Sequence, residues 1–273
     1  MAISKSDFEY VSQLAHSQAA IVLEPGKEYL VENRLGSLAQ REGFLSLEQL
    51  ISKMRSETVI NGLHHKTIDA LTTNETLFFR DFHPFEALRK IILPKLLETR
   101  GSARQLNVWS AACSSGQEPY SLAMLIREKF PQMNDWRINI LATDISPTVL
   151  KTAGEGVYSQ FEVNRGLPAT YLVKYFSKQN DKWVIKDDIK KMVQFKPLNL
   201  IQPWPMMPPC DLVFIRNVMI YFDFETRKTI LNKIRACLLP HGYLFLGTAE
   251  TTINLDASYQ PETVDKAVTF RPV

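Results

Sequence analysis

This chain of 273 residues has few cysteines, no long apolar run and no large excess of either charge. Its cysteines are Cys113, Cys210 and Cys237, an odd number without a C-x-x-C pair, which argues against a disulfide framework or a structural zinc site. No run of about 18 apolar residues predicts a membrane span, and residues 1–7 lack the apolar core of a signal peptide. We therefore expect a cytoplasmic protein with reduced cysteines and no membrane insertion.

The charge balance argues against nucleic acid as a partner. The formal net charge is only +3, and acidic and basic residues nearly cancel over residues 1–100. Nucleic-acid binding needs concentrated Lys and Arg, because neutralising phosphates supplies much of the affinity. Hydrophobic residues make up 45% of the chain, which is enough to build the core of one large domain or two smaller ones.

Residues 1–70 show helical patterns and no strand pattern. Apolar residues recur at helical spacing around Phe8–Ala15, Val31–Leu38 and Leu47–Met54. A fourth helix is expected from about Val59 to Leu71. A small helical bundle would bury these apolar faces together, so residues 1–70 predict such a bundle.

A basic stripe runs along the second of these helices. Lys27, Arg34 and Arg41 recur every seven residues, so they lie along one side of the helix beside its apolar face. From the residues alone, the stripe is either a solvated face or a docking surface for an acidic helix. His64 and His65 are adjacent and cannot both face one metal ion, so we expect them on the surface and expect no metal site.

From Leu106 the pattern changes to alternating strands and helices. The segment Leu106–Trp109 predicts a buried strand, Ala111–Gly116 a turn of small residues, and the apolar spacing from Leu122 to Phe130 a helix. A turn of this kind presents backbone N–H groups to a ligand. Because the turn has one glycine where the dinucleotide fingerprint needs three, we do not expect a dinucleotide.

Glu118, near the start of that helix, narrows the choice of ligand. A diphosphate would meet like charge there, whereas a cationic or hydroxyl-bearing ligand such as S-adenosylmethionine would not. An ordinary α/β turn without a ligand is the alternative. The next strand, Trp136–Asp144, ends in an acid where nucleoside-binding sheets hold ribose hydroxyls, although Asp144 also suits a helix cap.

Further strands are expected in the second half of the chain. They are Met192–Phe195, Asp211–Arg216, Tyr243–Gly247 and a final antiparallel edge strand, Ala267–Arg271. Asn199 and Leu200 follow the first of them, and Asn217 and Tyr221 follow the second, at the end where open α/β sheets bind ligands. Residues 157–190 read as an insertion with a hairpin-like turn at Gln179–Asp181.

Four motifs carry a family resemblance, in one order over nearly the whole chain: Thr72–Arg80, Trp109–Ser121, Ala142–Asp144 and Arg216–Phe222. Together they resemble the chemotaxis receptor methyltransferases, the CheR family. The resemblance implies an S-adenosylmethionine-dependent protein-glutamate O-methyltransferase. It also implies an N-terminal all-helical domain, a Rossmann-like class I methyltransferase domain with a mostly parallel sheet, and a small inserted antiparallel β-subdomain.

The resemblance also implies domain boundaries and partners. We place the helical domain and its linker at residues 1–83, the S-adenosylmethionine-binding domain at 84–273 and the inserted β-subdomain at about 157–192. The expected partner is the cytoplasmic helical domain of a chemoreceptor, and the enzyme is expected to act as a monomer. On this reading the stripe Lys27, Arg34 and Arg41 faces the receptor, so the docking interpretation is favoured.

Site residues follow from the same motif match. The residues implied in cofactor contact are Asn74, Thr76, Arg80, Glu118, Asp144, Asn199, Leu200, Arg216 and Asn217. Arg80 and Tyr221 are implied to lie nearest the transferred methyl group.

The chain departs from the family pattern in three places. Gly247–Glu250 stands where the family often has a His-Ser-Glu end, a change expected to touch architecture more than chemistry. Gln40 stands where some relatives are basic, which bears on receptor affinity. The turn Gln179–Asp181 is short and lacks the glycines of relatives that grip a receptor's C-terminal pentapeptide tether, so a tether-independent enzyme is expected.

Other functional classes remain as alternatives. One is a methyltransferase acting on another acceptor, and a second is a catalytically silent module that binds a receptor or S-adenosylmethionine. A dehydrogenase is the weakest, because the glycine fingerprint is missing.

Overall fold

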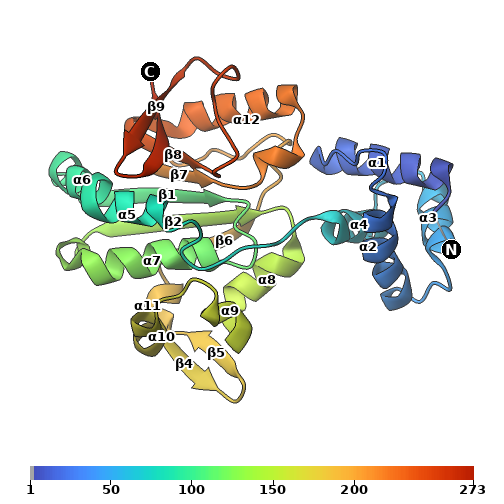
Figure 1. The fold of residues 1–273 in the computed structure, drawn as a ribbon, viewed down its shortest axis with the longest axis horizontal. Helices are drawn as coiled ribbons and strands as arrows, with labels where there is room; N and C mark the ends of the chain where they lie inside the picture. The colour runs from blue at the N-terminus through green and yellow to red at the C-terminus, as the bar shows by residue number, and fades with distance from the viewer. Residues whose placement is uncertain (1–2) are drawn as a thin grey trace.

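The computed structural model describes residues 3–273. It shows a small helical domain beside a larger α/β domain, with a second, smaller sheet projecting from the α/β domain (Figure 1). The predicted fold class is confirmed, including the inserted antiparallel element. The domain boundaries at residues 83 and 157–192 stay predictions.

Four helices form the N-terminal domain: α1 (Lys5–Ala19), α2 (Glu28–Arg41), α3 (Leu47–Ser56) and α4 (Gly62–Leu71). Their apolar faces meet in one core that includes Val11, Leu35 and Ile51, all fully buried. The surface placement expected for His64 is wrong, because its side chain is buried and its ring lies against the hydroxyl of Tyr10 and the side chain of Asn61.

A helical segment follows the linker and leads into the sheet. It consists of α5 (His83–Ala87), a π-helical turn (Leu88–Ile92) and α6 (Leu93–Arg100). The helix runs through Pro94. Proline lacks an N–H and its ring crowds the carbonyl four residues back, and the wider π turn accommodates both.

The main sheet has the strand order β6-β2-β1-β7-β8-β10-β9. Its parallel strands are β1 (Gln105–Ala111), β2 (Arg137–Asp144), β6 (Val193–Pro197), β7 (Cys210–Ile215) and β8 (Leu238–Leu246). Two antiparallel strands complete it, β9 (Tyr259–Val264) and β10 (Ala267–Pro272). The expected last strand is present, but it is not the edge: β10 lies between β8 and β9.

Helices cover both faces of this sheet (Figure 1). The covering helices are α7 (Gln117–Lys129), α8 (Pro147–Glu155) and α12 (Phe224–Cys237). Neighbouring strand residues can therefore both be apolar while facing different cores: Val108 packs in one core and Trp109 in the other. Burial on both faces explains the apolar run Leu212–Ile215 in β7.

The inserted element is a three-stranded antiparallel sheet of order β3-β5-β4. Its strands are β3 (Val157–Ser159), β4 (Phe176–Gln179) and β5 (Lys182–Ile185), accompanied by α9 (Gln160–Asn164), α10 (Ala169–Tyr175) and α11 (Asp187–Lys190). At the β4–β5 turn Asn180 adopts a left-handed conformation, with φ of 54°. The insertion joins the main core through Tyr158, which is fully buried.

Candidate active site

A cavity of about 590 Å³ lies between the helical domain and the carboxyl ends of the parallel strands. Its walls come from the segments that follow β1, β2, β6 and β7, from the linker after α4, and from the loop between α1 and α2. The carboxyl ends of parallel strands are where open α/β sheets bind ligands. Neighbouring strands place their loops together there, although the loops are far apart in sequence.

Every residue implied in cofactor contact lines this cavity: Asn74, Thr76, Arg80, Glu118, Asp144, Asn199, Leu200, Arg216 and Asn217. Tyr221 lines it as well. Of the basic stripe, Lys27 and Arg34 reach the cavity wall, whereas Arg41 is not among the lining residues. The structure thus brings these side chains to one place, and their roles in binding stay predictions.

The turn after β1 requires unusual backbone conformations. Ala112, Ser114 and Gly116 all have positive φ, of 53°, 51° and 93°. A Cβ on Gly116 would lie 2.9 Å from that of Ala153, so glycine is required both by its φ and by the helix packed against it. The small residues of this turn therefore serve the close approach of α8 as well as opening space for a ligand.

Asp144 is held at the floor of the cavity by the backbone. Its carboxylate accepts hydrogen bonds from the N–H groups of Ser114, at 2.8 Å, and Ser146, at 2.9 Å. Burial raises the pKa of Asp144, and these two backbone bonds act in the opposite direction. The cap of α8 is Ser146, whose hydroxyl accepts from the Val149 N–H at 3.2 Å, so the alternative role of Asp144 as that cap is wrong.

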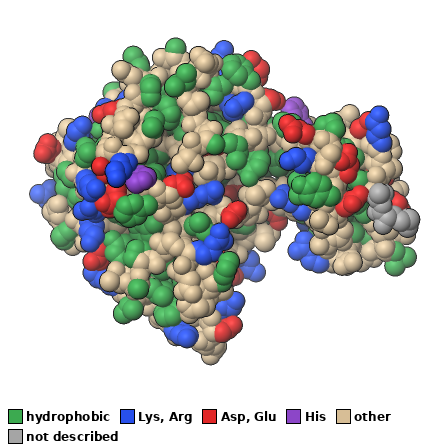
Figure 2. All heavy atoms as spheres, viewed as in Figure 1, with side chains coloured by type: hydrophobic (Ala, Val, Ile, Leu, Met, Phe, Trp, Pro, Cys, Tyr) green, Lys and Arg blue, Asp and Glu red, His purple; other side chains and the backbone are tan. Residues whose placement is uncertain are grey.

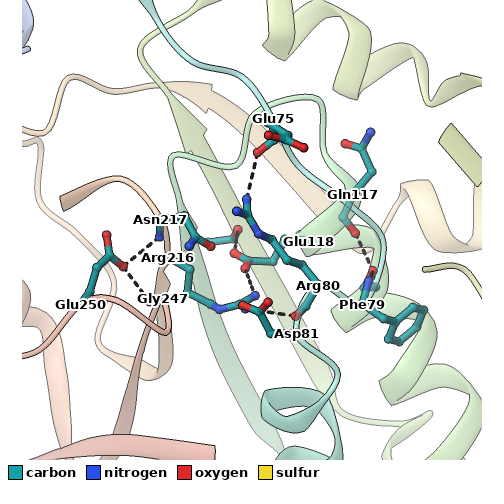
Figure 3. A network of polar contacts seen from close by, with 12 residues as sticks. Glu75, Phe79, Arg80, Asp81, Gln117, Glu118, Arg216, Asn217, Gly247 and Glu250 are labelled. Atoms are coloured by element: carbon teal, nitrogen blue, oxygen red, sulfur yellow. Dashed lines mark hydrogen bonds and ion pairs between the residues drawn. The ribbon is translucent and has the colours of Figure 1, made fainter. Parts of the chain in front are cut away.

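An ion network crosses the cavity wall, with Arg216 and Glu118 buried and Asp81 partly exposed (Figure 3). The Arg216 guanidinium donates to Glu118 at 2.9 Å and to Asp81 at 2.6 Å. Glu118 also accepts from the hydroxyl of Ser110 at 2.8 Å, and Arg216 donates to the carbonyl of Arg80 at 3.0 Å. Two residues expected to contact a cofactor, Glu118 and Arg216, therefore also bind each other.

Asp81 is a participant that sequence reasoning missed. It directly follows the Thr72–Arg80 motif, but nothing in a linker sequence indicates that its side chain turns back onto β7. The backbone around it is strained, since Phe79, Asp81 and Phe82 have φ of 50°, 67° and 50°. The ion pair to Arg216 is one contact that holds this conformation.

The side chain of Arg80 turns back onto its own linker segment. Its guanidinium donates to the backbone carbonyl of Glu75 at 3.0 Å (Figure 3). The adjacent Phe79 N–H donates to the hydroxyl of Ser121 on α7 at 2.9 Å. A Cβ on Gly166 would lie 2.1 Å from the Phe78 carbonyl oxygen, so the insertion also packs tightly against the linker. The backbone that carries Arg80 is thus fixed from two sides.

The helical domain forms one wall of the cavity and directly contacts the segments that follow β6 and β7. The Val22 N–H donates to the Tyr221 carbonyl at 3.3 Å, and Asn199 donates to the Gln18 carbonyl at 2.7 Å. Figure 2 shows Lys and Arg side chains around the junction of the helical domain and the α/β domain. Arg34 bonds the linker, donating to the carbonyl of Thr72 at 3.2 Å, so its guanidinium is not free as the stripe pattern suggested.

Within residues 3–273 no three or more His, Cys, Asp or Glu side chains lie together as a metal-binding group. No helix in this part of the chain has the length and apolar character needed to cross a membrane.

The doubly covered parallel sheet, and a cavity at the carboxyl ends of its strands, define the class as a Rossmann-like α/β ligand-binding domain. Comparison with known families is specific. Residues 6–72 match the CheR methyltransferase all-alpha domain, and residues 74–268 match the CheR methyltransferase SAM binding domain.

Full-length relatives agree with this assignment. "Chemotaxis protein methyltransferase 1" of Pseudomonas aeruginosa is 40% identical over 276 residues, covering 99% of both chains. "Chemotaxis protein methyltransferase Cher2" of Pseudomonas putida is 39% identical over 95% of both chains. The chain belongs to the CheR methyltransferase family. The family resemblance, the expectation of a methyltransferase enzyme and that of an S-adenosylmethionine-binding domain are confirmed.

Proposed function

We propose that the enzyme transfers methyl groups from S-adenosylmethionine to glutamate side chains of bacterial chemoreceptors, giving glutamyl methyl esters for chemotactic adaptation. The observation that carries the proposal is the single cavity in which Arg80, Tyr221 and every residue implied in cofactor contact meet. Relatives named as chemotaxis protein methyltransferases support the pathway. A receptor's cytoplasmic helices would be the partner, and the enzyme would then act in the cytoplasm.

The hydrogen-bonding and charged groups that line the cavity suit S-adenosylmethionine. Asp144 keeps acceptor capacity beyond its two backbone bonds and is the candidate for the ribose hydroxyls. The Asn217 Oδ1 is buried and has no partner within the described residues, so it is available to a ligand's N–H or O–H. Glu118 offers a negative charge for the amino group of the methionyl part.

The chemistry needs alignment more than proton transfer. A glutamate carboxylate has an unperturbed pKa near 4.3 and is ionised at neutral pH, so no general base is required. The cofactor supplies a methyl group activated by a sulfonium. Arg80 and Tyr221 then serve to orient the acceptor for in-line attack. Arg80 must also not hold the ionised carboxylate more tightly than the transition state, where its charge is being lost.

Methyl transfer to receptor-containing membranes tests the proposal. We expect tritium from labelled S-adenosylmethionine to appear on the receptor band and to be released as methanol by alkali, because a glutamyl methyl ester is base-labile. Cofactor binding without transfer would support the silent binding module. Label that alkali does not release would instead indicate a different acceptor.

Receptor docking is proposed to involve the exposed ends of the basic stripe. Replacing Lys27 and Arg41 by Glu is expected to raise KM for the receptor by about 5- to 20-fold with little change in kcat. The reason is that charged residues at the edge of an interface act mainly on the rate of association. The effect should shrink at high salt. Initial rates at varied receptor concentration measure it.

A matched control is the double variant Lys95→Glu with Lys129→Glu. Both residues are exposed, on α6 and α7, and both lie towards the amino ends of the parallel strands, away from the cavity. The control carries the same change of net charge. Equal KM values for the two double variants would show that α2 has no special part in docking.

We also propose that the enzyme works without a pentapeptide tether. The β4–β5 turn has only Asn180 and Asp181 between its strands and no glycine. An immobilised C-terminal receptor pentapeptide is therefore expected not to retain the enzyme, and receptors lacking that peptide should be methylated at an unchanged rate. Tight retention on the column would contradict this proposal.

A further inference from the structure

One carboxylate outside the cavity holds the loop that carries Tyr221. Glu250 lies in the turn after β8 and accepts hydrogen bonds from four backbone N–H groups (Figure 3). One oxygen accepts from Gly247 at 2.6 Å and Asn217 at 2.8 Å, and the other accepts from Val218 at 2.9 Å and Ile220 at 3.3 Å. Three of these four donors belong to the segment between β7 and α12.

Few backbone hydrogen bonds within this segment define its shape. Asn217 adopts a left-handed conformation with φ of 58°, and residues 219–221 form a single 3-10 turn. Within the segment, the backbone bonds are Tyr221 N–H to the Val218 carbonyl and Phe222 N–H to the Met219 carbonyl. The first N–H groups of such a turn have no partner inside it. Glu250 supplies that partner with charge-assisted bonds.

Gly247 makes the reach of Glu250 possible. A Cβ at residue 247 would lie 2.7 Å from the Glu250 carboxylate, and 2.8 Å from both nitrogens of Asn217. Any larger residue would push the carboxylate away from the loop after β7. The pair Gly247 and Glu250 therefore ties the ends of two neighbouring strands, β7 and β8, to each other.

We propose that Glu250 is a positioning residue for methyl transfer: it holds the Asn217–Phe222 loop so that Tyr221 stays directed at the cavity. Asn217, Val218, Ile220, Tyr221 and Phe222 all line the cavity, and Glu250 does not. Its effect on catalysis must therefore pass through the loop. The inference rests on the proposed function, since it assumes that Tyr221 aligns the acceptor.

Substitution of Glu250 separates this role from simple stabilisation. Glu250→Gln keeps the shape but turns one acceptor oxygen into an amide donor that faces N–H groups. We expect kcat on receptor membranes to fall by about 10²-fold, the scale of a small misplacement of an aligned group. The dissociation constant for S-adenosylhomocysteine should change by less than about 3-fold, because Asp144 and the linker are untouched.

Two variants accompany this one. Glu250→Asp keeps the charge on a shorter side chain and should recover part of the lost kcat. Thr248→Ala is the matched control, because Thr248 lies in the same turn and its side chain is exposed. The control should keep kcat within about 2-fold of the parent enzyme.

A double-mutant cycle with Tyr221 gives a readout that a purely structural role would not move. If Glu250 acts through Tyr221, the loss caused by Tyr221→Phe should be smaller in the Glu250→Gln background than in the parent enzyme. Independent losses, with full additivity in the logarithm of kcat, would overturn the inference. A Glu250→Gln enzyme within about 3-fold of parent kcat would overturn it too.

Failure of the proposed function would look different. It would show as a parent enzyme that transfers no methyl group to any receptor. In that case amide hydrogen exchange decides the anchoring itself: Asn217, Val218 and Ile220 should exchange at least about 10-fold faster in Glu250→Gln than in Thr248→Ala. Equal exchange in the two variants would overturn the inference.

Discussion

Arg80→Ala is expected to lower kcat/KM for receptor methylation by about 10²- to 10³-fold, the scale seen when one preorganised donor is removed from an active site. Arg80 lines the cavity, and its backbone is fixed by the Ser121 hydroxyl on one side and Arg216 on the other. Loss of its guanidinium removes a charge and the bond to the Glu75 carbonyl, whereas the two contacts that fix the Arg80 backbone remain. Single-turnover methyl transfer at saturating S-adenosylmethionine measures the effect on alignment apart from cofactor affinity.

Comparison variants decide what the loss means. Tyr221→Phe removes only a hydroxyl and should cost less than Arg80→Ala. Arg104→Ala removes an arginine that is 64% exposed and pairs with Asp135 away from the cavity, and it should leave the rate unchanged. Near-normal turnover in both Arg80→Ala and Tyr221→Phe would contradict the assigned roles.

Arg216→Met is expected to have the largest effect on stability. Its side chain is 2% exposed and neutralises Glu118, which is 11% exposed, and Asp81. Removing one partner of a buried ion pair leaves an uncompensated charge and costs about 3–5 kcal/mol. Urea unfolding followed by circular dichroism gives the change in unfolding free energy, and we expect cofactor binding to weaken in parallel.

The double variant Arg216→Met with Glu118→Gln tests the cause. If the uncompensated charge is responsible, removing the Glu118 charge should restore part of the stability lost in Arg216→Met. Arg104→Met, which breaks an exposed pair, should cost no more than about 1 kcal/mol. A double variant less stable than Arg216→Met alone would show that packing of the arginine stem matters more than its charge.

Local periodicity predicted most of the fold, because apolar residues recur in the sequence at the spacing typical of helices or of buried strands. The helical stripes of residues 1–70 and the apolar runs of β1 and β7 appear where expected. One error arose where a distant contact overrides a local rule. His64 is buried because Tyr10, from another helix, meets its ring.

The candidate site shows the same division. Motif residues such as Asp144, Arg80 and Asn217 were identifiable from the sequence, because their types and spacing match a known family. Asp81 and Glu250 were not assigned a role, since a carboxylate in a linker or a turn has many places to point. Only the folded chain shows that one meets Arg216 and the other meets four backbone N–H groups.

The sequence by itself determined the family, the two-part architecture and the set of polar residues that gather at one sheet edge. These depend on periodicity and on residue type at fixed spacing, which are local properties of the chain. The tertiary structure alone decided which charges neutralise each other, which stripe residue is already engaged, and which carboxylate fixes the Tyr221 loop. Such pairings join residues as distant as Arg216 and Asp81, and no local rule specifies them.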